Sequence, residues 1–85
     1  RKREIRLQDL AVANAFMTLQ AVELGLGTCW IGAYNAWKIR RLLKIPESAE
    51  VHSVLAIGYP HYTPAATERK PAAEIFCSED FNTPL

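Results

Sequence analysis

The residues whose types and spacing most suggest a binding or catalytic role lie in one short stretch, GLGTCWIG at positions 25–32. Its three glycines invite comparison with the glycine-rich loops that bind phosphate, but neither common pattern is complete. The dinucleotide-binding pattern G-x-G-x-x-G has Trp30 in place of its third glycine, and it follows a predicted helix instead of a strand. The pattern G-x-x-x-x-G-K fits Gly27 and Gly32, but Ala33 replaces its lysine. The sequence therefore predicts no phosphate loop of either kind.

These glycines have two other interpretations. Gly25 and Gly27 follow a helical pattern, and their positions favour a left-handed helix end and a turn. That interpretation leaves Gly32 unexplained, because this glycine comes after the apolar residues Cys29-Trp30-Ile31. A glycine at such a position has no Cβ, so its backbone amide can face a flat ligand directly.

A second candidate site is the cationic pair Arg69-Lys70, which directly precedes Pro71. Two cations on a loop stiffened by proline suit a phosphate monoester, because an arginine can bind two of its oxygens at once. Pairs of this kind also occur on loops that are simply solvated. Both interpretations are open from the residues alone.

The thiols and imidazoles predict less. Cys29 lies in an apolar stretch and has no histidine nearby to act as a base, so we expect it to be a core residue. His52 and His61 have no third ligand at metal-binding spacing, and we predict no metal site. With Cys77 as the second cysteine, the chain has too few thiols for a disulfide scaffold. Reduced cysteines favour a cytoplasmic protein.

Composition limits the classes of protein that this chain can represent. It has 85 residues, a net charge of +1, 49% hydrophobic residues and 22% charged residues, which indicates one globular domain. We expect neither a signal peptide nor a membrane span, because no apolar run approaches about 18 residues. A chain of this length buries only about 60% of its unfolded surface, so we expect it to need a partner.

The positions of the remaining elements follow from periodicity and from helix-ending residues. A helix over Asp9–Leu24 is predicted by the apolar spacing of Leu10, Ala13, Met17, Ala21 and Leu24, with Asp9 as its cap. The run Arg1–Arg6 is most simply the solvated start of a helix. A short strand is predicted at 29–31, followed by a helix at 36–44 that Asn35 caps and whose Ile39, Leu42 and Leu43 face inward. A strand at 50–59 is expected to be covered on both faces. The rest of the chain is predicted to form a loop at 61–70, a short strand at 72–77 and an exposed tail at 78–85. This order predicts an α+β fold.

Several of these pieces together resemble the C-terminal half of the FMN-dependent nitroreductase family. The resemblance begins with D-x-A-x-A-N at 9–14 and LQAVELGLGTCWIGAYN at 19–35. It continues in the same order with IRRLLKIPESAEV, LAIGYP and ERKPAAEIF, and so covers roughly Asp9 to Phe76. It implies that residues 1–85 are the C-terminal part of a single nitroreductase-like domain whose N-terminal half is absent.

The resemblance also implies a function and a set of site residues. It implies a homodimeric flavoprotein with FMN at the dimer interface, in which NAD(P)H reduces the flavin and a nitroaromatic, quinone or similar acceptor takes the electrons. The residues Trp30, Ile31, Gly32 and Ala33 would lie along the isoalloxazine ring, with the amides of Gly32 and Ala33 toward N5. Arg69 and Lys70 would bind the FMN phosphate.

The resemblance assigns no catalytic acid or base to these residues, because the hydride chemistry belongs to the cofactor. Without the missing half, this chain alone is expected to be inactive.

The residues leave two alternatives to a flavin enzyme open. The first is a dimerisation module without a cofactor, which the need for a partner would equally explain. The second is a nucleic-acid-binding domain with a basic N-terminal arm. A net charge of +1 provides little electrostatic attraction to nucleic acid, and about ten residues separate the two predicted helices. A helix-turn-helix joins its helices with three or four residues, so we expect no nucleic-acid partner.

Overall fold

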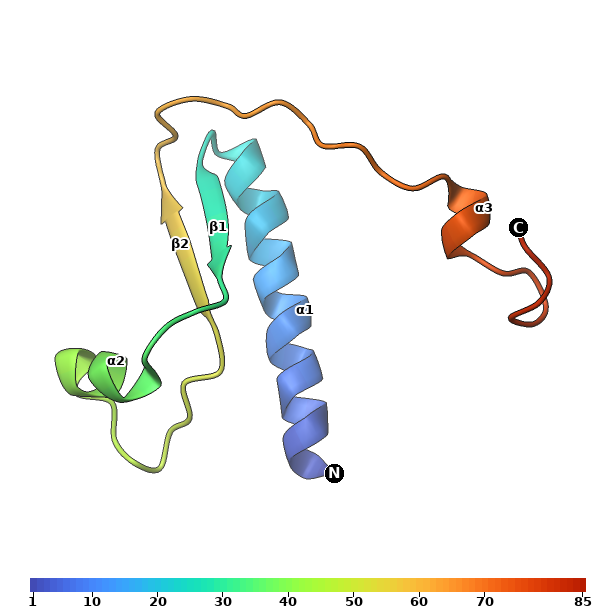
Figure 1. The fold of residues 1–85 in the computed structure, drawn as a ribbon. Coiled ribbons are helices and arrows are strands. Elements are labelled where there is room, and N and C mark those ends of the chain that lie inside the picture. The colour runs from blue at the N-terminus through green and yellow to red at the C-terminus, as the bar shows by residue number, and fades with distance from the viewer.

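The computed structural model describes all residues from 1 to 85. It combines helices with a small antiparallel sheet, which agrees with the predicted α+β class. The long first helix runs beside the sheet, while the C-terminal segment extends away from both (Figure 1). The elements in chain order are α1 (Lys2–Glu23), β1 (Gly27–Ile31), α2 (Ala36–Leu43), β2 (Val54–Gly58) and α3 (Ala72–Ile75).

Helix α1 is longer than the predicted helix. It begins at Lys2, so the prediction that Asp9 caps its start is wrong, and the basic opening run belongs to the helix. The residues between these positions are good helix formers with no glycine or proline to interrupt them. The end of the helix is as predicted: Gly25 has φ +76°, and the N–H of Leu26 donates to the carbonyl of Ala21 at 2.8 Å.

Strands β1 and β2 pair antiparallel over five residues each. Gly27 lies opposite Gly58 at one end of the ladder, and Ile31 lies opposite Val54 at the other. The prediction of a strand over 50–59 is too long, because β1 offers partners to only five residues. The predicted cover on both faces is also absent, and Ile57 is 50% exposed.

Helix α2 begins where the sequence predicts. The side chain of Asn35 accepts a hydrogen bond from the N–H of Lys38 at 3.1 Å, which satisfies one of the free amides of the first turn. The helix ends at Leu43, and Lys44 directly after it adopts the left-handed conformation with φ +55°. The prediction that Leu42 and Leu43 face inward is wrong, because they are 80% and 65% exposed.

The predicted strand at 72–77 is also wrong. Residues Ala72–Ile75 form the short helix α3, which starts directly after Pro71. Pro71 is the N-cap, and its carbonyl accepts a hydrogen bond from the N–H of Glu74 at 3.0 Å. The following Ala-Ala-Glu then favours the helical conformation. After α3, the backbones of Cys77 and Pro84 form an isolated antiparallel β-bridge. Residues 59–71 contain no helix or strand and lead away from the sheet (Figure 1).

The interior of the chain is very small. Only Asn14 and Ala21 are buried, at 9% and 4% exposure. The accessible surface is 7956 Å², whereas a folded monomer of 9.5 kDa is expected to expose about 5,000 Å². The radius of gyration is 17.4 Å, against about 12 Å for a compact domain of this length. Much of the apolar surface therefore needs cover from other polypeptide.

Candidate functional site

The predicted ring-contact residues lie where the sheet ends. Trp30 and Ile31 are the last residues of β1, and they are 48% and 38% exposed. Gly32 and Ala33 follow as the first residues of the short connection to α2, and both are exposed. The structure therefore keeps these four residues together at one end of β1, with their surface open.

The backbone of this connection is available for binding. The N–H groups of Gly32 and Ala33 donate to no backbone carbonyl of the chain, and no side chain accepts from them. A Cβ added at Gly32 would meet no atom within 4 Å. Free amides beside open space, next to an exposed indole, fit a flat and largely apolar ligand that accepts hydrogen bonds at its edge.

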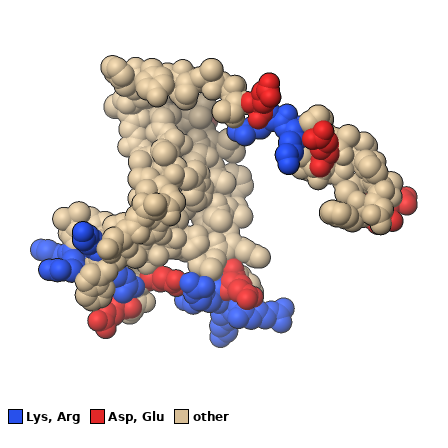
Figure 2. Space-filling view, in the orientation of Figure 1, with Lys and Arg blue, Asp and Glu red and all other residues tan.

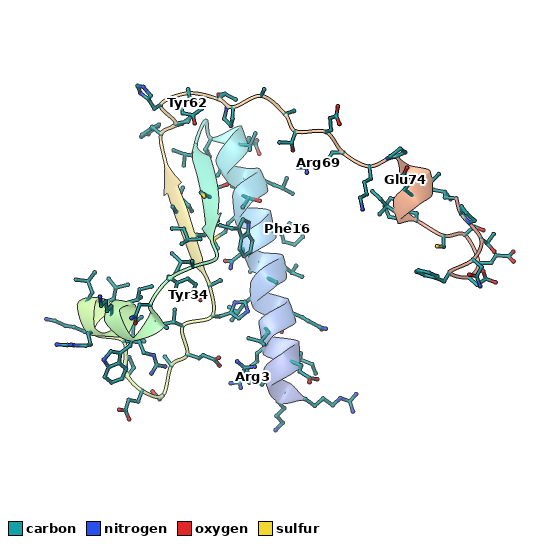
Figure 3. All side chains as sticks on the ribbon, viewed as in Figure 1. Arg3, Phe16, Tyr34, Tyr62, Arg69 and Glu74 are labelled. Carbon is teal, nitrogen blue, oxygen red and sulfur yellow. The ribbon has the colours of Figure 1, made fainter.

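Two hydrogen bonds hold the surroundings of this connection. The Tyr34 hydroxyl donates to the backbone carbonyl of His52 at 2.9 Å. The Asn14 side chain, on α1, donates to the hydroxyl of Ser53 at 2.7 Å. Figure 3 shows Tyr34 on the connection between β1 and α2, beside the segment that leads into β2. No local pattern marks Tyr34, Asn14 or Ser53 as paired residues, because the partners in these two bonds are 18 and 39 residues apart in the sequence.

The largest hollow of the chain lies close to this segment. It has a volume of about 540 Å³ and is bounded by α1, α2 and residues 50–55. Most of its lining is aliphatic. Its carboxylate, Glu50, is paired with Arg3, and its amide, Asn14, is paired with Ser53. The hollow therefore offers no unpaired charge to a ligand, and its apolar lining suits a packed side chain or segment.

The predicted phosphate-binding pair lies elsewhere. Arg69 and Lys70 are exposed, form no ion pair, and belong to the segment that runs from the sheet to α3. Figure 3 shows Arg69 on this segment, away from the sheet. That segment leaves the sheet from the end of β2 where Gly58 lies opposite Gly27, whereas Ile31 lies at the other end of the ladder, opposite Val54. A single chain therefore does not bring the phosphate-binding pair and the ring-contact residues together.

Charge is unevenly distributed over the molecule. Figure 2 shows Lys and Arg at the start of α1, around α2 and near α3, while the surface over the sheet and the second half of α1 carries little charge. The single salt bridge joins Arg3 to Glu50 at 2.6 Å. The hydrogen bond and the positive charge of Arg3 lower the pKa of the Glu50 carboxyl below its usual range.

The remaining candidate residues stay separate. Cys29 is exposed, so the prediction that it is a core residue is wrong for this chain, and Cys77 is exposed as well. The structure brings no three His, Cys, Asp or Glu side chains close enough together to hold a metal ion. No helix combines the length and the apolar character that crossing a bilayer requires.

Comparison with known proteins gives a consistent result. The model of the nitroreductase family matches residues 1–59. A protein of Methanothermobacter thermautotrophicus named "Putative NADH dehydrogenase/NAD(P)H nitroreductase" is 38% identical over 66 residues, which cover 73% of this chain and 35% of that protein. A protein of the same name from Archaeoglobus fulgidus is 40% identical over 58 residues, covering 64% of this chain and 33% of its own length. The chain thus spans about a third of the length of these curated relatives.

Proposed function

Because this chain belongs to the nitroreductase family, we propose that the whole protein is an FMN-dependent NAD(P)H oxidoreductase. It would use NADH or NADPH to reduce a nitroaromatic, quinone or similar small acceptor. The observation that carries the proposal is the pair of unbonded amides at Gly32 and Ala33, which lie beside open space at the end of β1. Both relatives are named as NAD(P)H nitroreductases, which supports the same class of reaction.

Within that enzyme, these residues would bind and orient the cofactor. Trp30 and Ile31 provide exposed apolar surface for the isoalloxazine ring, and the amides of Gly32 and Ala33 donate to its edge. FMN, once bound, supplies the hydride chemistry of the reaction. Arg69 and Lys70 are exposed and unpaired, so they suit the phosphate.

We further propose that the enzyme is a homodimer and that its cofactor site lies between two chains. The ring-contact residues and the segment that leads to the phosphate-binding pair lie at opposite ends of the β1–β2 ladder in one chain, so a second copy provides a way to unite them. The long segment that carries Arg69 and Lys70 projects away from its own sheet, in the manner of an arm that reaches a neighbour (Figure 1).

Helix α1 supports an interface of this kind. Its residues Ile5, Val12, Phe16 and Leu19 recur at spacings of seven, four and three, so they share one face of the helix. That face lies opposite the buried Asn14 and Ala21, and Figure 3 shows Phe16 on the side away from the sheet. Phe16 and Leu19 are 66% and 68% exposed. A helix that is apolar on two opposite faces requires a packing partner on each of them.

The excess surface indicates that a dimer alone does not cover this chain. It exposes about 2,900 Å² more than expected for its mass, whereas a standard interface covers about 800 Å² per partner. We propose that the rest of the same domain covers the difference, including the hollow beside α2. Residues 1–85 then hold only a part of the flavin site.

The alternative is a dimerisation module without a cofactor, and the exposed apolar face of α1 favours it equally. The visible absorption spectrum of the purified full-length protein, before and after addition of NADH or NADPH, separates the two. A flavin spectrum that bleaches with either nucleotide is the expected result. A colourless protein that takes up no added FMN would contradict the proposal and leave the module as the function. Sedimentation of the same sample tests the dimer.

A further inference from the structure

We propose that Tyr34 is a positioning residue that fixes the backbone of Gly32 and Ala33 for flavin binding. The inference rests on the proposed function, since it concerns the same site. Tyr34 acts through its hydroxyl, which donates to the carbonyl of His52, and it need not contact the flavin itself.

The need for such a residue follows from the connection that holds the amides. Residues 32–35 join β1 to α2 and contain no regular structure. The ladder fixes one end, where Ile31 pairs with Val54, and the cap at Asn35 fixes the other. Between these points, Gly32 and Ala33 make no hydrogen bond through their amides. Glycine also has the widest backbone freedom of any residue, so the direction of these amides needs another constraint.

Tyr34 supplies that constraint across a long stretch of sequence. Its hydroxyl reaches a backbone carbonyl 18 residues further along the chain, and the contact is partly buried. A main-chain acceptor cannot rotate away as a side chain can. The bond therefore ties the residue that follows Ala33 to the chain just before β2.

The acceptor segment is itself held in place. Ser53, the neighbour of His52, accepts a hydrogen bond from Asn14 of α1 at 2.7 Å. Asn14 is one of the two buried residues of the chain, and hydrogen bonds of buried side chains tend to specify a single arrangement. Helix α1, residues 52–53 and the connection after β1 thus form one linked unit.

Removing the hydroxyl should cost affinity mainly by releasing the connection. A ligand that binds a mobile loop must order it, whereas a fixed loop avoids this cost. The loss of one hydrogen bond of this kind corresponds to a fall in FMN affinity of about fivefold to tenfold. The amides should also meet the ring edge less regularly, which should shift the visible absorption band and the midpoint potential of the bound flavin.

The test uses the full-length protein and the variant Tyr34→Phe, which removes only the hydroxyl. Tyr59→Phe is the matched control, because Tyr59 is 88% exposed and its hydroxyl has no partner in the chain. FMN affinity is measured by titration, together with the absorption band and midpoint potential of the bound flavin and the melting temperature of the flavin-free protein. We expect weaker binding and an altered band for Tyr34→Phe alone, with a fall in melting temperature of only about 2–4 °C.

Two results would overturn the inference while leaving the proposed function intact. One is a Tyr34→Phe protein that binds FMN as the parent does, with the same band and potential. The other is a Tyr34→Phe protein whose flavin-free form is destabilised by as much free energy as FMN binding loses, while the spectrum of the bound flavin is unchanged. That result would make Tyr34 purely structural. A parent protein that binds no FMN would instead refute the proposed function and the inference together.

Discussion

Replacement of Gly32 by valine tests whether this backbone lies against the flavin. The substitution adds a branched side chain beside the amides of Gly32 and Ala33. A Cβ at this position meets no atom of the chain within 4 Å, and the φ angle of Gly32 lies outside the left-handed region. The chain itself should therefore tolerate valine, and any effect should come from whatever occupies the open space.

The size of the effect follows from the packing of that space. Forcing extra carbon atoms into a close contact costs typically about 1–3 kcal/mol, which corresponds to a loss of about five- to 160-fold in FMN affinity. The flavin-free protein should keep its melting temperature, because a Cβ at this position meets no atom of residues 1–85 within 4 Å.

Gly25→Ala provides the matched control in a full-length protein. Gly25 also has open space around its Cβ position, but its φ of +76° strains any other residue. Alanine there should lower the free energy of unfolding by about 0.5–1 kcal/mol, as the left-handed strain exceeds the gain from a stiffer unfolded chain. FMN affinity should stay at the parent value.

Equal FMN affinity for Gly32→Val and the parent would refute the ring contact. A lower melting temperature of flavin-free Gly32→Val would show that protein fills this space.

Three further predictions follow from single side chains. Lys44→Gly should raise the free energy of unfolding by about 0.5–1 kcal/mol in urea titrations, because Lys44 has φ +55°; no change would argue against this helix end. Glu50→Gln should lower the melting temperature at neutral pH. The lowered pKa of Glu50 makes its pairing with Arg3 stabilising above pH 4.5, so the difference from the parent should vanish as the pH falls through the folded pKa. A constant difference at all pH values would contradict this. Arg69→Ala should weaken FMN binding about ten- to 100-fold and reduce its salt dependence, with no change in the flavin-free melting temperature; unchanged binding would remove Arg69 from the phosphate site.

Local signals determined the parts of the fold that depend on a few neighbouring residues. The end of α1 follows from Gly25, and the start of α2 follows from Asn35. Each depends on hydrogen bonds within six residues, so the residue type is enough to predict it. The start of α1 was missed because Asp9 can either cap a helix or lie inside one.

Side-chain burial depended on partners that periodicity cannot supply. The apolar patterns of Leu42 and Ile57 correctly mark surfaces that favour burial, but burial needs another layer of polypeptide against them. The last predicted strand failed for a related reason. An apolar run as short as Ala72–Cys77 forms a strand only where another strand pairs with it. No strand pairs with this run, and its first four residues form α3.

For the candidate site, the sequence alone determined which residues have suitable chemistry: a side-chain-poor backbone at Gly32 and a cationic pair at Arg69-Lys70. Only the tertiary structure decided that Gly32 and the segment leading to Arg69-Lys70 lie at opposite ends of the β1–β2 ladder, and that Tyr34 is tied to the carbonyl of His52. Residue type and local spacing predict structure only among residues within one or two helical turns of one another. The pairing of β1 with β2 joins residues more than 20 positions apart, and it is this pairing that sets where each candidate lies.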